Sequence, residues 1–176
     1  MKVYVEAQIH LLISFSHIKN NCAKGYFDIR GTMAINWTDP YCKITKHFTV
    51  AEALWLHRWN RMASVYDGFD EYHQENLIVL FQKMELVRAY FGRPIHITSA
   101  FRPYHYNRMI GGAVHSAHTY GMAADWHISG LSGDICRYWL VRKLHEWDMR
   151  CENSPRTSWV HLDIREPSAN GRFFRP

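Results

Sequence analysis

The sequence is poor in cysteine, and its few cysteines form no recognisable pattern. Cys22, Cys42, Cys136 and Cys151 are widely scattered and include no C-x-x-C pair, which argues against a zinc ribbon. A chain of 176 residues is also long enough not to depend on a disulfide framework. We therefore expect buried free thiols, with a disulfide left open if the protein meets an oxidising compartment.

Long apolar runs are also missing. No stretch approaches the roughly 18 continuous apolar residues that a membrane span needs. The short run from Ile9 to Phe15 is interrupted by His10, is preceded by Lys2 alone, and is followed by no small-residue cleavage site. We expect a chain that is made in the cytoplasm without a signal peptide and that does not span a membrane.

The charge is mildly positive, and no basic run accompanies it. A net charge of +5 fits either an ordinary solvated surface or an acidic partner such as a cell-wall polymer. Without a basic stripe it does not favour nucleic acid, and we expect no such partner. Apolar residues make up 47% of the chain, enough for one domain with its own core, and no internal repeat is visible.

A first helix is predicted near residue 49. Thr49 and Glu52 have the spacing of a capping box, and Trp55, Trp59 and Met62 would share one face of the helix that follows. Before it, residues 1–45 show little beyond turn signals and an alternating start at residues 3–5 that could begin a strand.

Helices and strands then alternate along the chain. Apolar residues at spacings of three and four predict a helix over 74–90, and Ser132 can cap another whose inner face carries Cys136, Trp139, Leu140, Leu144 and Trp147. Alternation or β-branched residues predict strands over 95–98, 123–128, 147–152 and 159–164. The expected fold is α+β, with helices packed on one face of a small antiparallel sheet.

One stretch places an imidazole and a carboxylate close together. His118 and Asp125 are seven residues apart, with Gly121 between them, and alternation in the strand near 160 turns His161 toward one face. Two imidazoles and one carboxylate suit a zinc ion and leave its fourth position open to water. The pair alone is weak, because a histidine is more often a surface or core residue than a ligand.

The wider pattern is more specific. Its segments are Ser99-Ala-Phe-Arg102-Pro, Asn107, Gly111-Gly112-Ala, Ser116-x-His118-x-x-Gly121-x-Ala-x-Asp125 and Trp159-Val-His161. In order and spacing they resemble the zinc D-Ala-D-Ala metallopeptidases, which are peptidoglycan carboxypeptidases, dipeptidases and phage endolysins that share a fold with the hedgehog signalling domain. The resemblance covers about residues 46–165, and the opening Lys46-His-Phe-Thr is similar to a phage-rich branch.

The resemblance implies roles for several residues. It makes His118, Asp125 and His161 the ligands of one zinc ion, in a sheet that carries them. It implies that Arg102 steadies the oxyanion that develops on the substrate carbonyl, a task that suits a fixed guanidinium. A structural ion pair is the alternative for Arg102. Ser116 resembles a serine beside the substrate, and on sequence alone it is equally well a turn residue.

The chain departs from the family pattern at the general base. Many members carry an acid three positions before the last histidine ligand, and this chain has Ser158 there, which cannot accept the proton. The nearest upstream acids are Asp148 and Glu152. We favour Glu152, which similar phage-type sequences share, although it could also be a solvated loop acid. The less favoured substitutes are His115, His127 and Asp163.

We therefore expect an N-terminal extension of unknown role over 1–45 and a zinc peptidase domain over 46–176. The expected activity is hydrolysis of a peptide bond in the peptidoglycan stem, as a carboxypeptidase or an endopeptidase of the endolysin type. The alternative is a catalytically silent zinc module that binds the wall or belongs to a virion. We expect a monomer that acts on the cell wall, as a phage lysin or virion component.

Overall fold

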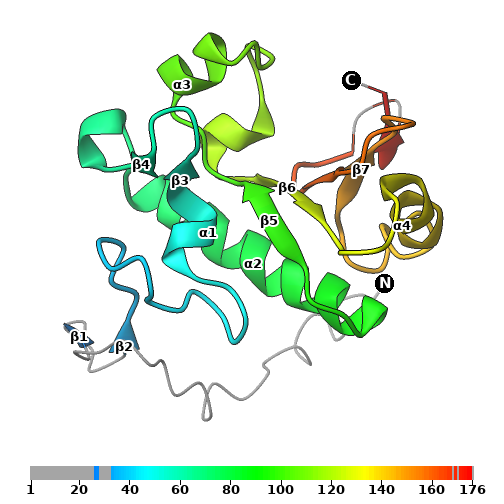
Figure 1. The fold of residues 1–176 in the computed structure, drawn as a ribbon, viewed down its shortest axis with the longest axis horizontal. Helices are drawn as coiled ribbons and strands as arrows, with labels where there is room; N and C mark the ends of the chain where they lie inside the picture. Colours follow the sequence, from blue (N-terminus) through cyan, green and yellow to red (C-terminus); the bar gives the residue numbers. More distant parts are fainter. Residues whose placement is uncertain (1–25, 28–32, 168, 170, 176) are drawn as a thin grey trace, which may run out of the picture.

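A five-stranded sheet lies at the centre of the chain (Figure 1). The computed structural model describes residues 26–27, 33–167, 169 and 171–175. The strands are β5 (His96–Ser99), β6 (Ala123–His127), β8 (Val160–Asp163), β7 (Arg150–Glu152) and β9 (Phe173–Phe174), in the order β5-β6-β8-β7-β9. All neighbours pair antiparallel except β7 and β9, which run parallel. The expected α+β fold with a small antiparallel sheet is confirmed, and β9 is an addition that the sequence did not predict.

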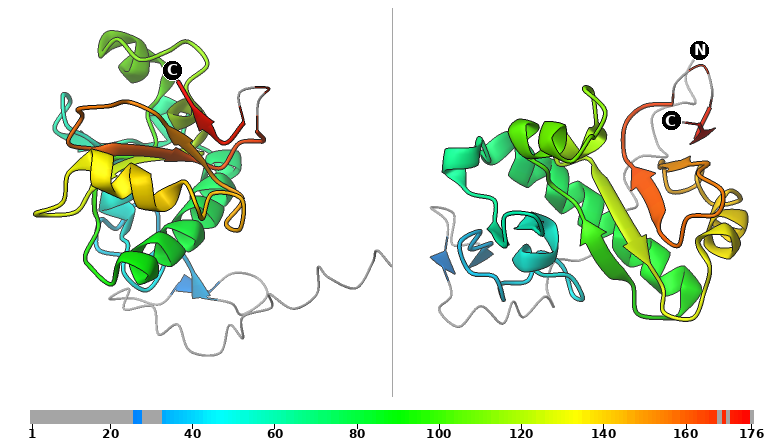
Figure 2. Two further views of the ribbon diagram at one scale, coloured as in Figure 1. Left: turned by 90° about the vertical axis from the view of Figure 1, so that its right-hand side faces the viewer. Right: turned by 45° about the horizontal axis from the view of Figure 1, so that its top comes forward.

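Two helices cover one face of this sheet. Figure 2 shows α2 (Glu71–Phe91) and α4 (Gly133–Leu140) on the same side of it. Asp70 caps α2 by accepting a hydrogen bond from the amide of His73, and Gly92 ends the helix in the left-handed conformation. The helix predicted over 74–90 is therefore confirmed and begins three residues earlier. Its buried stripe is the predicted one: Leu77, Leu80, Phe81, Met84 and Val87.

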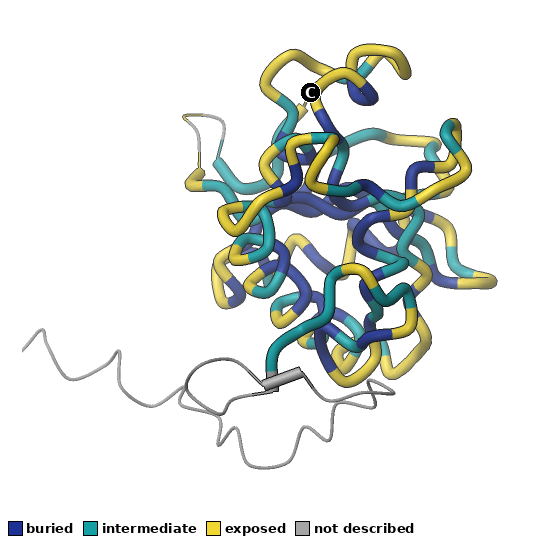
Figure 3. Tube along the Cα trace, turned by 90° about the vertical axis from the view of Figure 1, so that its left-hand side faces the viewer, coloured by how far each residue is buried: buried dark blue, intermediate teal, exposed yellow. Residues whose placement is uncertain are grey.

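Alternation in the two central strands divides the sheet into an apolar face and a polar face. On β6 and β8 the paired residues Ala124 and Leu162 are fully buried in the core against the helices. The next pair along, Asp125 and His161, turns to the opposite face. Figure 3 shows the buried layer running through the middle of the molecule. The core thus fixes which side chains reach the polar face.

The chain after residue 49 is the main difference from expectation. The capping box of Thr49 and Glu52 is present, but helix α1 covers only Val50–Leu54. The longer helix through Met62 is wrong, because the chain turns extended at Trp55 and forms the hairpin of β3 (Trp55–Leu56) and β4 (Arg61–Met62). Asn60 takes a left-handed conformation with φ 51°, which a helix does not accommodate and which asparagine tolerates better than most residues.

The remaining elements are short. They are β1 (Tyr26–Phe27), β2 (Met33–Ala34), α3 (Tyr104–Met109) and the 3-10 turns η2 (Val65–Asp67) and η3 (Ala117–Tyr120). Ser132 caps α4 as predicted, yet Trp139 is 43% exposed and does not belong to its inner face. The helix also ends at Leu140, so Leu144 and Trp147, although buried as predicted, lie beyond it in the turns that follow. Within the described residues, no helix is long and apolar enough to cross a membrane.

The N-terminal part is described only from residue 26, with a gap over 28–32. The strand start predicted at residues 3–5 lies outside the described residues. Cys42 and Ile44 are buried in the same core as the later helices, and the division at residue 45 stays a prediction. Cys42 is disulfide-bonded, the possibility that the sequence had left open, whereas Cys136 and Cys151 are buried and free as expected.

Candidate metal centre

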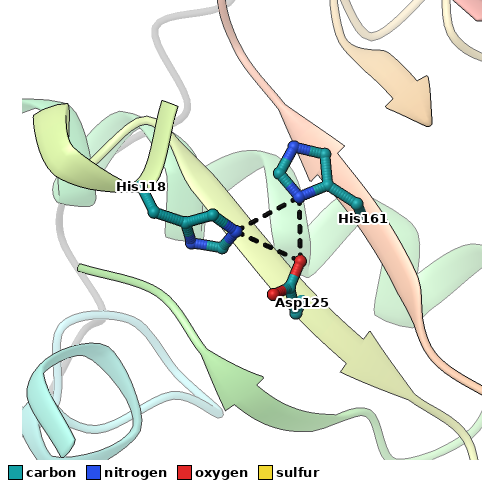
Figure 4. A group of neighbouring side chains, drawn as sticks. All are labelled: His118, Asp125 and His161. Carbon is teal, nitrogen blue, oxygen red and sulfur yellow. Dashed lines mark hydrogen bonds and ion pairs between the residues drawn. The ribbon is translucent and has the colours of Figure 1, made fainter. Parts of the chain in front are cut away.

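Three side chains converge on the polar face of the sheet (Figure 4). His118 comes from η3, Asp125 from β6 and His161 from β8. Asp125 Oδ1 lies 3.1 Å from His118 Nε2 and 2.8 Å from His161 Nδ1, and the two nitrogens are 3.2 Å apart. The residues singled out from the sequence therefore present one ligand atom each to a common point.

The turn that carries His118 is fixed from both sides. Ser116 caps it, since its hydroxyl accepts the amide hydrogen of His118 at 3.4 Å. The carbonyl of His118 accepts the amide of Arg102 at 3.0 Å, which ties η3 to the end of β5. From α2, the Asn76 side-chain amide donates to the Tyr120 carbonyl at 2.9 Å. The turn-residue reading of Ser116 thus has a direct hydrogen bond, and its substrate role stays a prediction.

The second ring nitrogen of His118 determines which nitrogen is free. Nδ1 lies 2.7 Å from the carbonyl of Ala100, which can only accept, so Nδ1 carries the proton. Nε2 then points its lone pair at the common point. Burial keeps the ring neutral by lowering the pKa of His118 to about 4. A neutral imidazole with its far nitrogen hydrogen-bonded is the usual form of a histidine metal ligand.

Arg102 pairs with the carboxylate ligand. Its Nη2 bonds to Asp125 Oδ2, and its Nε donates to Ser99 Oγ at 2.9 Å. One carboxylate oxygen is thereby occupied, and Oδ1 is left for the site. Although burial alone would raise it, the pKa of Asp125 lies well below its usual range because His118 and His161 stabilise the charged form. The ion pair considered as an alternative for Arg102 is present, and it orients a ligand.

His161 is held by a buried carboxylate on its other side. Its Nε2 lies 3.6 Å from Asp163 Oδ2, and Asp163 is fully buried. Arg150 binds Asp163 through both Nε and Nη2, at 2.8 and 2.9 Å, and Arg165 adds a further bond at 3.2 Å. Burial lowers the pKa of His161, but Asp125 and Asp163 outweigh it and raise this pKa to about 9. A metal ion at Nδ1 would have to displace a proton.

Glu152 lies in line with the ligands across the sheet. The pairs Ser99–Asp125 and Asp125–His161 form a row over β5, β6 and β8. The register of β7, with Cys151 opposite Leu162, sets Glu152 beside His161 on the next strand, and Glu152 itself pairs with Phe174 of β9. Partners in such a row project to one face. Glu152 therefore stands beside His161, with one oxygen accepting a hydrogen bond from the Ser154 hydroxyl.

The other candidate bases lie elsewhere. Asp148 is exposed and pairs with Arg172 at 2.7 Å and with Lys83 at 3.5 Å, and Ser158 is exposed on the approach to β8. Asp163 is committed to its arginine pairs. His127 stacks on His96 with ring centroids 5.1 Å apart, and His115 is exposed. Of the two weighed acids that the sheet brings beside His161, Asp163 is fully buried and bound to arginines, which leaves Glu152 as the candidate.

A pocket of about 480 Å³ opens next to the ligands. Asp125, Arg102 and Ser99 form the wall that it shares with the metal centre. Its far wall comes from the β3–β4 turn and α3, which the sequence had not connected with the site. Asp163 and Arg150 were missed as supports of His161. The role of Asp163 could have been predicted, because the alternation from Trp159 to Asp163 puts Asp163 on the same face of the strand as His161.

The donor set fits zinc. Two nitrogens and one carboxylate oxygen leave a fourth tetrahedral position, as catalytic zinc sites require. In addition, the far nitrogen of His118 is fixed by a carbonyl and that of His161 faces a carboxylate, which is the supporting arrangement typical of bound zinc. No other group of three such residues with converging ligand atoms occurs in the described part of the chain.

Comparison with known families agrees with this geometry. A family model described as Peptidase M15 matches residues 46–163, which includes all three converging ligands. No curated protein matches the chain. The matched segment covers most of the chain and nearly the whole length over which the sequence pattern was recognised. The chain therefore belongs to the peptidase M15 family, the zinc D-Ala-D-Ala metallopeptidases.

Proposed function

We propose that the protein is a zinc peptidase that hydrolyses a peptide bond in the bacterial peptidoglycan stem. The observation that carries this proposal is the convergence of three ligand atoms, no more than 3.2 Å apart, at the edge of a pocket large enough for part of a peptide. Membership of the family supports a peptide substrate of the peptidoglycan type. The position of the new terminus in the cleaved stem peptide distinguishes a carboxypeptidase from an endopeptidase.

His118, Asp125 and His161 would hold the ion. When bound, zinc supplies a Lewis acid that polarises a peptide carbonyl and acidifies water. Arg102, paired with Asp125, presents its guanidinium at the wall shared by the metal centre and the pocket. Its position is fixed by Asp125 and Ser99, so it meets negative charge developing on the substrate oxygen without reorganising first.

Glu152 is the residue that we assign as general base. Its place beside His161 supports the assignment, because a base must come within hydrogen-bond reach of the attacking water. Its charge also acts on Arg102. Burial lowers the pKa of Arg102. The negative charge of Asp125, and to a smaller extent that of Glu152, raises it. Glu152 would accept a proton from the water and pass it to the leaving amine.

The test uses the full chain loaded with zinc and synthetic stem peptides, with products identified by mass spectrometry. The Glu152→Gln variant should bind one equivalent of zinc and lose about 10²- to 10⁴-fold in kcat, the usual contribution of a general base. Asp148→Asn is the matched control, since it removes a neighbouring carboxylate that lies in a separate ion pair, and it should retain activity.

The alternative is a zinc-containing module that binds wall fragments without cutting them, and the serine at position 158 favours it. A wild-type protein that carries zinc, binds stem peptides and generates no new termini would establish the alternative. Full activity in Glu152→Gln would instead remove Glu152 from the mechanism and leave the peptidase proposal intact.

We further propose that the protein acts on the cell wall as a monomer, as a phage lysin or virion component. The phage-like opening at Lys46 to Thr49 supports this. Added zinc-loaded protein should lower the turbidity of bacteria whose outer barrier has been permeabilised, and it should elute as a single chain in size-exclusion chromatography with light scattering.

A further inference from the structure

The pocket beside the metal centre has two unlike walls. Arg102 and Asp125 belong to the wall already described, and their charges are paired with each other. The opposite wall carries His57 and Arg58, which come from the turn between β3 and β4. Figure 1 shows that this turn and α3 lie at the same end of the molecule. A substrate seated at the ligands would therefore extend toward a segment far from them in sequence.

The turn holds Arg58 in place by its backbone. The Arg58 amide donates to the hydroxyl of Tyr106 on α3 at 3.2 Å. The neighbouring Trp59 ring packs edge-on against Tyr106, with centroids 5.0 Å apart. The amide of Trp59 closes the turn onto the carbonyl of Leu56 at 3.0 Å, and Leu56 is buried. Arg58 is thus an exposed residue presented from an anchored turn.

No described acid neutralises Arg58. The acids closest to Arg58 in the sequence have other partners: Asp67 forms a two-pronged pair with Arg61 at 2.6 and 2.7 Å, and Glu52 bonds back to Thr49 as part of the cap. Among the described residues, the Arg58 guanidinium takes part in no ion pair or hydrogen bond. The pocket consequently has an uncompensated positive charge on the wall away from the ligands.

The rest of that wall is apolar. Met109 and Ile110, at the end of α3, are 49% and 39% exposed and line the pocket. A guanidinium binds a carboxylate through two parallel hydrogen bonds, and the adjacent aliphatic surface suits the short carbon chain that carries the carboxylate. Small apolar amino acids ending in a carboxylate, or a longer side chain with one, have this chemistry.

We propose that this pocket recognises a carboxylate of the substrate peptide and that Arg58 is the residue that selects for it. The proposal rests on the proposed function, because it assigns a specificity residue to the same site. The carboxylate can come from two sources, the C-terminus of the stem or a side chain within it. Arg58 would bind either carboxylate in the same way. Peptides in which one or the other carboxylate is converted to an amide distinguish the two sources.

The experiment measures binding and cleavage separately with the full chain. Four stem peptides are compared: both carboxylates free, the C-terminus amidated, the side chain amidated, and both amidated. Calorimetry on the metal-free protein gives Kd, and initial rates on the zinc-loaded protein give kcat/KM. Arg58→Gln should weaken binding and kcat/KM about three- to tenfold for the peptide with both carboxylates, given the usual strength of a partly exposed pair. It should change the doubly amidated peptide less than twofold.

Two further variants make the result specific. Arg58→Lys keeps the charge without the fork and should recover part of the loss. Arg142→Gln removes an equal charge from the turn that follows α4, where Arg142 lies over the rings of Tyr138 and Trp139, and it should leave binding and kcat/KM unchanged. Unchanged urea midpoints show that each variant is folded. If one singly amidated peptide has the same Kd and kcat/KM as the doubly amidated peptide, the carboxylate that it lacks is the one that Arg58 binds.

Three outcomes overturn the inference: no difference between acidic and amidated peptides, a preference that survives in Arg58→Gln, or no binding of any of the four. The proposed function fails independently. Charge-dependent binding without cleavage would refute the peptidase and keep the pocket assignment, whereas cleavage that ignores the carboxylates would do the reverse.

Discussion

The ion pair behind His161 gives the sharpest stability prediction. Asp163 is fully buried and accepts two hydrogen bonds from Arg150, which is itself only 7% exposed. Replacing Asp163 by leucine leaves the Arg150 charge buried with its main partner gone. The remaining contacts of Arg150, a 3.3 Å bond to the Glu166 carbonyl and the face of Phe174, do not neutralise it.

The expected cost follows from the geometry. Breaking a buried pair from one side destabilises a protein by about 3–5 kcal/mol, because the surviving charge has lost its compensation. That is a large part of a typical unfolding free energy of about 5–15 kcal/mol. At about 2–4 °C per kcal/mol for a chain of this size, Asp163→Leu should lower Tm by about 6–20 °C.

The double variant separates the charge from the packing. Arg150→Met combined with Asp163→Leu removes both charges and fills the space with apolar side chains of similar volume. It should be more stable than Asp163→Leu alone, since replacing a whole buried pair is often neutral. Melting curves are recorded by circular dichroism with a chelator present, because metal bound to the native state would add its own stabilisation.

The melting temperatures of the wild type, Arg150→Met, Asp163→Leu and the double variant form a double-mutant cycle, and one outcome of it would refute the reasoning. If the two single changes simply add in the double variant, the residues do not interact as the 2.8 and 2.9 Å contacts imply. A cost below about 1 kcal/mol for Asp163→Leu would likewise show that water reaches Arg150, and the burial argument would be wrong.

Three further predictions concern other parts of the molecule. Gly112→Ala would place a Cβ 2.1 Å from Oδ1 of the buried Asn107, and this overpacking should cost about 1–3 kcal/mol in urea unfolding, while the exposed Ala113→Ser should cost almost nothing. Asp67 has a pKa lowered to about 2, chiefly by its hydrogen bonds from Arg61, so its stabilisation is complete above the unfolded pKa of about 4 and is lost as the pH falls through 2. The stability gap between wild type and Asp67→Asn should therefore shrink between pH 5 and pH 2, and a constant gap would contradict this. Removing zinc with a chelator should lower Tm and stop hydrolysis, and stoichiometric zinc should restore both; an unchanged Tm would indicate that no native metal site exists.

The sequence predicted the elements whose signals are local. The capping box at Thr49 needs only a hydroxyl and a carboxylate three residues apart, and the stripe of α2 needs only its own periodicity. Alternation likewise placed His161 on a face opposite the aliphatics. These features depend on near neighbours in the chain, so a single sequence contains them.

What the sequence did not predict depends on contacts between distant segments. The β3–β4 hairpin replaced a helix because Asn60 turns the chain and Leu56 finds a place in the core, which periodicity alone does not reveal. The parallel addition of β9 beside β7 and the pairing of Arg150 with Asp163 join residues from separate strands. In the same way, the pocket wall around Arg58 depends on the hydrogen bond from the Arg58 amide to the hydroxyl of Tyr106, a residue 48 positions later in the chain.

Ser99, Asp125, His161 and Phe174 lie in one row across the sheet. The register of the strands therefore decides which side chains reach the metal centre. If β8 slid by a single position, Leu162 or Val160 would stand where His161 does, and an aliphatic chain would face the ion. Metal binding would therefore report on assembly, because the three ligand atoms come together only when the strands have paired in this register. An insertion or deletion inside β8 should therefore be far less tolerated than a substitution of Val160 or Leu162 by another aliphatic residue.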